Sequence, residues 1–488
     1  MRILVTGVTG LVGRALALRL ARDGHEVLGW VRDPQAARAV LGGAVTLVPS
    51  AGGDAALDEV IGRVDAVVNL AGAPVARRWT RAHVRALEDS RVGVTDRLVA
   101  AMRRAERRPS VLVSASAVGY YGDRGEETLT EDARPGDDFL ARLCVRWEDA
   151  AREAEALGVR VVLLRIGLVL DGEGGVIAAM RPAFALGLGA TLGAGAQRVP
   201  FIHRRDLVEL VVTALLDRRY VGPVNAVAPA PTTQRELTRS LARALGRPAL
   251  LRVPAFALRL GLGRAADVVL HGQAAVPRRA LALGFRFCFP ELDAAVRDVV
   301  DGGRSGVTVG LARELPADEY VARRRPRYLL EQRTLIAAPR SEVFDFFRRA
   351  ENLGPMTPPA LAFEILTPTP VEMHEGREIA YRIRLGPAPM RWLTRIGAWD
   401  PEERFVDLQL RGPYRAWYHE HRFEARGDAT LMIDRVWYAP PLGPLGRVAQ
   451  VVMVGPMLRR IFGHRRGAIE LRFGLAEPTG DAPDSLAA

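Results

Sequence analysis

Three glycines near the start of the chain, Gly7, Gly10 and Gly13, have the spacing of a phosphate-binding turn. They follow the apolar run Arg2–Val5 and precede an amphipathic stretch, so the expected context is strand, turn and helix. Gly7 would permit the tight turn, Gly10 would let the backbone approach a pyrophosphate, and Gly13 would let the helix pack closely on the strand. The amide groups that begin the helix would face the phosphates. The spacing predicts a dinucleotide site; the alternative is a tight turn without a ligand.

The end of the second predicted strand, Glu26–Val31, bears on which dinucleotide would bind. NAD sites place a carboxylate there to hold the ribose 2′-hydroxyl, whereas NADP sites accommodate the 2′-phosphate with an arginine. Trp30 stands at the expected carboxylate position and Arg32 follows it. This pattern favours NADP(H), while Asp33 leaves NAD as the alternative.

The cationic side chains exclude several kinds of chemistry. Lysine and arginine together number 68, and every one of them is arginine. No lysine is therefore available to form a Schiff base, to bind phosphate in a P-loop, or to complete a Tyr-x-x-x-Lys catalytic pair. Any proton transfer must use other groups.

These residues need a scaffold, and residues 1–300 alternate short apolar runs with amphipathic segments. Such alternation predicts a parallel sheet covered by helices on both faces, which is a doubly wound α/β fold. The predicted strands are Arg2–Val5, Glu26–Val31, Val45–Val48, Ala66–Leu70, Ser110–Ser114 and Arg160–Arg165. The predicted helices are Gly13–Asp23, Arg81–Glu106 and Leu140–Leu157.

The pattern changes after residue 300. Residues 301–327 are rich in Gly, Ser and charge, and we expect a linker there. Residues 328–475 hold several strands in close succession and then one long helical pattern, which predicts a separate α+β domain. The polar tail, 476–488, is expected to be disordered.

Several motifs carry a family resemblance over about the first 300 residues. They are Thr6–Gly13, Asn69–Gly72, Arg78–Thr80, Ser90–Arg91, Ser114–Gly122, Trp147–Glu148, Phe201–Leu207 and Gly272–Phe287. With these motifs the chain resembles the atypical epimerase-like branch of the extended short-chain dehydrogenase/reductases. The resemblance implies a Rossmann fold that binds NADP(H), with residues 250–300 as a C-terminal family module. The cofactor residues that it implies are Gly7, Thr9, Gly10, Leu11, Val12, Gly13, Arg32, Leu70, Ala71, Gly72, Arg78, Ser114 and Ala115.

The same resemblance exposes a gap in the catalytic centre. Members of the superfamily use serine, tyrosine and lysine, and Ser116 matches the serine. The tyrosine and lysine positions hold Leu140 and Cys144. Tyr120 or Tyr121 could replace the missing acid/base, with Arg91 or Arg78 supplying positive potential; packing beside the nicotinamide is the alternative. On the substrate side the resemblance places His203 and Asp206, for which a strand-end contact is an equal alternative.

Residues 328 to about 475 resemble the START-like helix-grip superfamily, which includes polyketide cyclases and carriers of apolar ligands. The motifs are Ile336–Phe346, Asn352–Leu353, Met356–Pro359 and Gly412–Phe423, followed by a long helix. The resemblance implies a curved sheet that grips this helix around an apolar cavity holding a hydrophobic ligand.

His419 and His421 alternate on one predicted strand, so both side chains share a face. A metal would need further ligands, and neither His374 nor His464 has a suitable spacing. We therefore expect cavity lining or packing, and no metal site.

The charge and composition of the chain limit the binding partners and the cellular location that we expect. The formal net charge is +12, but the arginines are scattered among acids, so we expect no nucleic-acid partner. Cys144 and Cys288 lie far apart, which fits a reducing compartment. No signal peptide and no apolar run of about 18 residues is recognisable, so we expect a cytoplasmic protein without an integral membrane segment; a homodimer is left open.

Two functions remain open. The first is an NADP(H)-dependent oxidoreductase or epimerase-like enzyme acting on a small apolar metabolite. The second is a non-catalytic NADP(H)-binding sensor or assembly factor with a ligand-binding module.

Overall fold

The computed structural model describes residues 1–41, 43–172, 174–301, 307–385, 388–441, 443, 446 and 449–476. The chain divides into two compact units, Met1–Val300 and Asp301–Ala488. Each unit has its own sheet and its own buried core.

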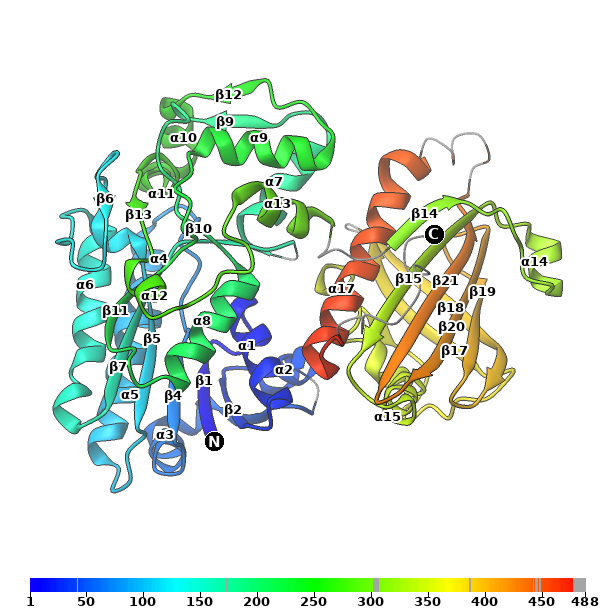
Figure 1. Ribbon diagram of the computed structural model, residues 1–488, viewed down its shortest axis with the longest axis horizontal. Helices are drawn as coiled ribbons and strands as arrows, with labels where there is room; N and C mark the ends of the chain where they lie inside the picture. Colours follow the sequence, from blue (N-terminus) through cyan, green and yellow to red (C-terminus); the bar gives the residue numbers. More distant parts are fainter. Residues whose placement is uncertain are drawn as a thin grey trace. The chain divides into compact units, whose positions relative to one another are not determined.

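A seven-stranded parallel sheet forms the centre of the first unit, in the order β11-β7-β5-β4-β1-β2-β3. Helices cover both of its faces, with α1 and α8 together on one face and α3, α5 and α6 packed against the other (Figure 1). The strand order reverses between β1 and β4, as in the Rossmann arrangement. The predicted α/β fold is confirmed. The strands are β1 (Arg2–Thr6), β2 (Glu26–Val31), β3 (Thr46–Pro49), β4 (Ala66–Asn69), β5 (Val111–Ala117), β7 (Arg160–Ile166) and β11 (Gly222–Ala226).

The helices around this sheet begin and end close to the predicted limits, with two differences. The predicted helix Arg81–Glu106 is two helices joined by a π-helical turn, Asp89–Gly93, and the predicted helix Leu140–Leu157 ends as an α-helix at Arg152. The helices are α1 (Leu11–Arg22), α2 (Pro34–Leu41), α3 (Gly53–Ile61), α4 (Arg81–Glu88), α5 (Val94–Arg104), α6 (Phe139–Arg152) and α8 (Arg204–Leu216).

Three short parallel strand pairs lie outside the main sheet: β6 with β13, β8 with β10, and β9 with β12. The pairs β6 with β13 and β9 with β12 bring the segment after β11 back against earlier parts of the unit. Their bounds are β6 (Thr128–Leu129), β8 (Leu168–Leu170), β9 (Ala190–Leu192), β10 (Phe201–His203), β12 (Leu251–Val253) and β13 (Ala274–Ala275). The helices of this region are α7 (Gly175–Ala185), α9 (Gln234–Leu245), α10 (Ala255–Leu262), α11 (Asp267–Leu270), α12 (Arg278–Ala282) and α13 (Leu292–Asp301).

The second unit is an antiparallel sheet of eight strands, in the order β14-β15-β21-β20-β19-β18-β17-β16. The predicted α+β character with antiparallel strands is confirmed. The strands are β14 (Val307–Leu311), β15 (Tyr328–Ile336), β16 (Glu364–Ile365), β17 (Glu378–Leu385), β18 (Ala388–Asp400), β19 (Arg404–Arg411), β20 (Ala416–Arg426) and β21 (Ala429–Ala439).

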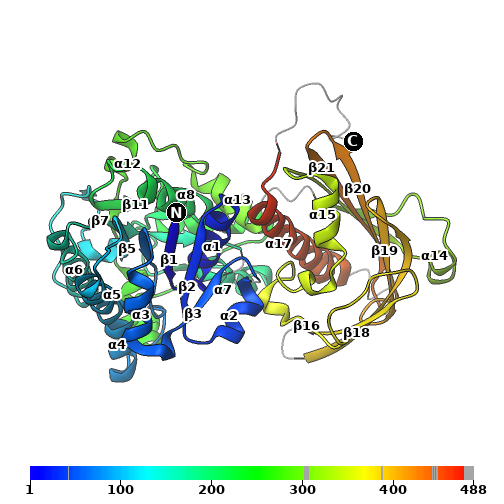
Figure 2. The same ribbon diagram turned by 90° about the horizontal axis from the view of Figure 1, so that it is seen from below.

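Two helices, α15 (Arg340–Phe347) and α17 (Gly455–Phe473), lie on one face of this sheet (Figure 2). Phe344 of α15 and Ile469 of α17 share a buried cluster with Phe405 and Phe423 of the sheet. The final helix is therefore part of the core of the second unit.

The expected linker at 301–327 differs from the structure. β14 lies within it and pairs with β15, and α14 (Glu319–Arg324) follows. The segment extends the second sheet because the alternating apolar residues of β14 find a partner strand. The expected disordered tail lies outside the described residues from 477 onwards.

Among the described helices, none is both long enough and apolar enough to cross a membrane.

Candidate functional site

The glycine turn lies between β1 and α1, where the backbone leaves no room for side chains. Gly7 has a φ of +65°, and a Cβ atom on it would lie 2.6 Å from the carbonyl oxygen of Leu70. A Cβ on Gly13 would lie 2.2 Å from the carbonyl oxygen of Gly7. Gly10 caps α1 without any side-chain hydrogen bond, so no side chain occupies the amide groups of the first helical turn. Such a turn can bind a phosphate group.

The strand register brings the predicted cofactor residues to one edge of the sheet. Thr6 is paired with Trp30 on β2 and with Asn69 on β4, and Asn69 is paired with Ser114 on β5. The segments that follow, Gly7–Gly13, Arg32, Leu70–Gly72 and Ala115, therefore leave the sheet side by side at its carboxyl edge. Ligands of open α/β sheets bind at this edge, where the strand order reverses.

Buried hydroxyl and amide groups hold this edge together. Thr6 Oγ1 donates to Asn69 Oδ1 over 2.6 Å and accepts from the amide of Ala71 over 3.2 Å. Asn69 Nδ2 donates to Thr95 Oγ1, which also accepts from Trp147 Nε1. This chain of bonds ties β1 and β4 to helices α5 and α6.

Beyond β2, the two charged candidates have different environments. Arg32 is exposed. Asp33 Oδ1 accepts hydrogen bonds from the amides of Gln35 and Ala36, both over 3.0 Å, so it caps the start of α2. Asp33 is therefore engaged by the protein itself.

Ser116, the expected substrate-binding serine, belongs to a buried ion-pair network. Its hydroxyl donates to Glu148 Oε1 over 2.7 Å. Arg165 holds the same carboxylate with two bonds, Nε to Oε1 over 2.8 Å and Nη2 to Oε2 over 2.9 Å. Burial opposes the charge of Arg165, but the bonds and charge of Glu148 outweigh it and raise the pKa of Arg165.

The two tyrosine candidates both contact Arg165 of this network. Tyr121 is completely buried, and its hydroxyl donates to Asn225 Oδ1 and accepts from Arg165 Nη1. Burial raises the pKa of Tyr121. The hydroxyl of Tyr121 thus has two protein partners, and the acid/base role offered for Tyr120 or Tyr121 stays a prediction. Tyr120 is half-buried, and the guanidinium carbon of Arg165 lies 3.5 Å from the centre of its ring.

The positions where the superfamily has tyrosine and lysine are apolar. A Cβ atom on Gly119 would lie 3.5 Å from Leu140 Cβ, in ordinary contact. Cys144 is buried on α6, and burial raises the pKa of its thiol to about 12, with a smaller contribution from the charge of Glu148. The thiol is therefore protonated at neutral pH.

The two arginines that were offered as sources of positive potential also differ. Arg91 is largely enclosed, and its Nη2 donates to the carbonyl oxygen of Ala73 over 2.9 Å. A Cβ on Gly72 would lie 3.2 Å from the same nitrogen. Arg91 thus holds the loop after β4. Arg78 lies exposed farther along that loop.

His203 and Asp206 bind the protein's own backbone. His203 Nδ1 accepts from the amide of Arg205, and Nε2 lies 3.1 Å from Asp298 Oδ2. Both carboxylate oxygens of Asp206 accept backbone amides, from Cys288 over 2.7 Å and Phe289 over 2.9 Å. Both residues therefore have protein partners, and their place on the substrate side stays a prediction.

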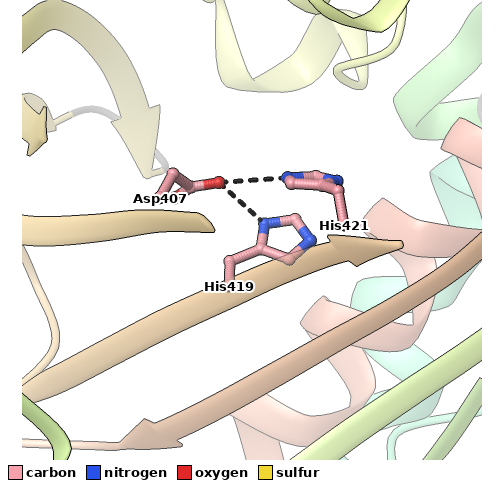
Figure 3. Close-up of side chains that lie close together, drawn as sticks. All are labelled: Asp407, His419 and His421. Atoms are coloured by element: carbon pink, nitrogen blue, oxygen red, sulfur yellow. Dashed lines mark hydrogen bonds and ion pairs between the residues drawn. The ribbon is translucent and has the colours of Figure 1, made fainter. Parts of the chain in front are cut away.

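In the second unit, His419 and His421 lie in a buried charged cluster rather than among packing residues alone. Asp407 Oδ2 lies 3.2 Å from His419 Nδ1 and 3.1 Å from His421 Nε2 (Figure 3). Asp434 Oδ1 lies 3.2 Å from His419 Nε2 and 2.8 Å from His421 Nδ1. Burial disfavours the charge on His419, but Asp407 and Asp434 outweigh it and raise its pKa; burial and the neighbouring His419 lower the pKa of His421.

Comparison with known proteins gives the first unit a family. The model of the NAD dependent epimerase/dehydratase family matches residues 3–226, and a domain of unknown function, DUF1731, matches residues 253–299. The chain is 39% identical to the Arabidopsis thaliana "Epimerase family protein SDR39U1 homolog, chloroplastic" over 302 residues, which are 62% of this chain and 87% of the relative. It is 41% identical to the Mycobacterium tuberculosis "Epimerase family protein MT2273" over 288 residues, 58% of this chain and 93% of the relative.

The chain belongs to this epimerase family. Among solved structures, human epimerase family protein SDR39U1 (isoform 2) with NADPH is 35% identical, with a TM-score of 0.54 over 61% of this chain and 99% of that one. UDP-N-acetylglucosamine 4-epimerase from Bacillus cereus is 20% identical with a TM-score of 0.50, a likeness in fold alone. The two family models match residues 3–226 and 253–299, and both ranges lie within the first unit.

The sequence analysis did not identify the residues that form hydrogen bonds and ion pairs with the candidate site residues. Arg165 was seen only as a strand end, and Asn225, Asp407 and Asp434 were not considered. Arg165 carried one signal, because a charged residue within the apolar run Arg160–Ile166 must find a buried partner. Asp407 and Asp434 lie on strands with their acidic side chains facing the interior, and strand alternation alone could have placed Asp434 there.

Proposed function

We propose that the first unit binds NADP(H) at the carboxyl edge of its parallel sheet. The observation that carries this proposal is the first turn of α1, whose amide groups have no side-chain cap and follow a turn without room for a Cβ atom. Gly7, Thr9, Gly10, Leu11, Val12 and Gly13 would surround the pyrophosphate. Leu70, Ala71, Gly72, Arg78, Ser114 and Ala115 would line the rest of the cofactor.

Three further observations support NADP(H) over NAD. Arg32 is exposed after β2, within reach of the position where a 2′-phosphate is bound in Rossmann folds. Asp33, the residue that could favour NAD, caps α2 with one of its oxygens. The human family member of known structure, 35% identical, was determined with NADPH.

We further propose that this unit is an NADP(H)-dependent oxidoreductase or epimerase-like enzyme for a small, apolar metabolite. A bound nicotinamide supplies or accepts a hydride. Of the side chains expected to assist, Tyr120 has a hydroxyl for which no hydrogen-bond partner is found among the described residues, and the guanidinium group of Arg165 packs on its ring. Ser116 and Tyr121 act on this view as positioning residues, because their hydroxyls bind Glu148 and Asn225.

One observation favours a second candidate, a non-catalytic NADP(H)-binding sensor or assembly factor. Leu140 and Cys144 replace the proton-transfer pair, and the pKa of Cys144, raised to about 12 by burial, keeps its thiol protonated. A unit of this kind would respond to the redox state of the cofactor by changing its conformation or its binding partner. It would not turn over a substrate.

The two functions are distinguished by titration and kinetics on the purified protein. NADPH and NADH are titrated by cofactor fluorescence, and NADPH oxidation is then followed by stopped flow with a panel of small aldehydes, ketones and enones. Turnover that falls about 10²-fold or more in Tyr120→Phe, with NADPH affinity retained, supports the enzyme. Tight NADPH binding without turnover of any substrate supports the sensor, and absence of NADPH binding refutes both.

For the second unit we propose a START-like module that binds a hydrophobic ligand. The strand β15 pairs with the last strand, β21, and α17 then lies on the sheet, as in a helix-grip arrangement. Trp392 of β18, Trp417 of β20 and Tyr414 of the connection before β20 gather against Leu458 and Phe462 of α17. Native mass spectrometry of the purified protein tests this proposal: a co-purifying apolar molecule that survives mild activation supports it, and failure to bind any of a lipid and polyketide-like panel contradicts it.

A further inference from the structure

Two neighbouring strands place a carboxylate and two imidazoles on one face of the second sheet. β19 and β20 are antiparallel, and Asp407 is directly opposite His419 in their register. His421 follows two residues later, so its side chain points to the same side as that of His419. The fold thus assembles three ligand-type side chains without any contribution from a loop.

The distances between these groups suit a shared ion. Asp407 Oδ2 lies 3.2 Å from His419 Nδ1 and 3.1 Å from His421 Nε2. Neighbouring ligands of a tetrahedral Zn²⁺ ion are about 3.3 Å apart when each bond is about 2.0–2.1 Å long. The three donor atoms all lie within 4.8 Å of one another. We propose that Asp407, His419 and His421 bind a divalent transition-metal ion.

The outer side of the cluster has the arrangement that such an ion requires. The ring nitrogens that would not bind metal, His419 Nε2 and His421 Nδ1, lie 3.2 and 2.8 Å from Asp434 Oδ1. Metal-binding histidines usually donate their other N–H to a carboxylate, which orients the ring. Arg465 Nη2 lies 3.5 Å from the same oxygen of Asp434, whose charge it partly balances, and 3.1 Å from His421 Nδ1.

The donor set selects the class of metal. Two imidazole nitrogens and one carboxylate oxygen suit Zn²⁺, Fe²⁺ or Co²⁺, whereas Mg²⁺ and Ca²⁺ prefer sites built from oxygen. Three protein ligands leave at least one position for water or for an oxygen atom of a bound molecule. The side chain of Asp407 is 17% exposed while those of His419 and His421 are 7% and 5% exposed, so access is from the side of Asp407.

The test uses the full-length protein, stripped with a chelator and titrated with Co²⁺ while the visible ligand-field bands are recorded. We expect one equivalent per chain, displaced by Zn²⁺. Asp407→Asn should weaken binding about 100-fold or more, and Asp434→Asn about 10- to 100-fold. Asp407→Glu, which keeps a carboxylate, should retain binding. His374→Gln, which alters an exposed histidine elsewhere in the unit, should leave it unchanged.

A second measurement keeps the proposal open to refutation if a variant fails to fold. X-ray absorption at the zinc edge of the wild-type protein should show two imidazole ligands and a shell of light atoms. Absence of stoichiometric Co²⁺ or Zn²⁺ binding, a metal spectrum without imidazole ligands, or equal affinity in a folded Asp407→Asn protein would overturn the assignment. None of these outcomes depends on NADP(H) binding by the first unit.

Discussion

The hydroxyl of Ser116 donates a hydrogen bond to the carboxylate of Glu148 over 2.7 Å, and both side chains are buried. Glu148 is held in turn by two bonds from Arg165, whose side chain is 2% exposed. A serine that is committed to a carboxylate cannot at the same time donate to a substrate oxygen. This relationship is the basis for proposing that Ser116 positions the site and does not bind substrate.

Replacing Ser116 with alanine should therefore affect stability more than chemistry. Glu148 keeps both bonds from Arg165, so the expected loss is about 1 kcal/mol in the free energy of unfolding. Denaturant unfolding and NADPH titration measure both properties. Ser110→Ala, at an exposed serine, is the control. If Ser116→Ala instead lowers a measured turnover about 10²- to 10⁴-fold without changing stability, the serine is catalytic.

Glu148→Gln should destabilise the first unit strongly. The substitution removes the charge that compensates the buried Arg165, and breaking a buried pair in this way costs about 3–5 kcal/mol. Glu153→Gln is the matched control, because Glu153 pairs with Arg103 at the surface, where both side chains are 60% exposed. Its expected loss is at most about 1 kcal/mol. Similar unfolding free energies for the two variants would contradict the buried network.

Arg32→Ala should reduce the preference for NADPH over NADH. A hydrogen bond between charged groups contributes about 1.5–3 kcal/mol, so affinity for NADPH should fall about 10- to 100-fold while affinity for NADH stays constant. Arg38→Ala removes an exposed arginine from the adjacent α2 and should change neither value. Fluorescence titration with both cofactors gives the comparison. Equal losses for NADPH and NADH would place Arg32 outside the phosphate site.

Cys144 should make stability depend on alkaline pH. Its pKa is 9.0 in an unfolded chain and is raised by burial to about 12 in the folded protein. Between these values the unfolded chain has lost the proton while the folded protein retains it, so stability falls as the pH rises, with a slope approaching about 1.4 kcal/mol per pH unit. Below pH 9 the contribution is constant.

Two measurements check this expectation. The unfolding free energy of Cys144→Ala should lack the additional slope above pH 9. In the native protein at neutral pH, iodoacetamide should label the exposed Cys288 and leave the buried Cys144 unmodified. Rapid labelling of Cys144 before unfolding would show that its surroundings are not closed.

The sequence was sufficient for those features that depend on local pattern. The turn from Gly7 to Gly13 follows from three glycines between a strand and a helix, and the parallel sheet follows from alternating elements. Leu140 and Cys144 could be recognised as replacements from their spacing before Glu148. The antiparallel character of the second unit was also readable from closely spaced strands.

The remaining features depend on pairs that are distant in the chain. Tyr121 was a candidate acid because its hydroxyl was not known to reach Asn225, 104 positions later. The family resemblance placed His203 and Asp206 on the substrate side, and the sequence could not show their contacts with Asp298 and Phe289 in a later segment. For the same reason, the sequence did not show that Asp407 and Asp434 lie beside the two histidines. In each case the residue type indicated that the side chain could take part in catalysis or ligand binding. Which group the side chain contacts depends on the tertiary structure.

The pairing of β15 with β21 has a consequence for synthesis on the ribosome. The first unit can begin its sheet early, because β1 pairs with β2 only some 24 residues downstream. In the second unit, Tyr328 on β15 pairs with Tyr438 on β21, so this pairing can form only after β21 has been synthesised. Contacts between residues so far apart in the chain form slowly. A nascent chain that has released β15 can pair it with the preceding strand β14, but the other edge of β15 stays open until translation of β21 is complete. During that interval, binding by a chaperone would protect the growing chain from aggregation.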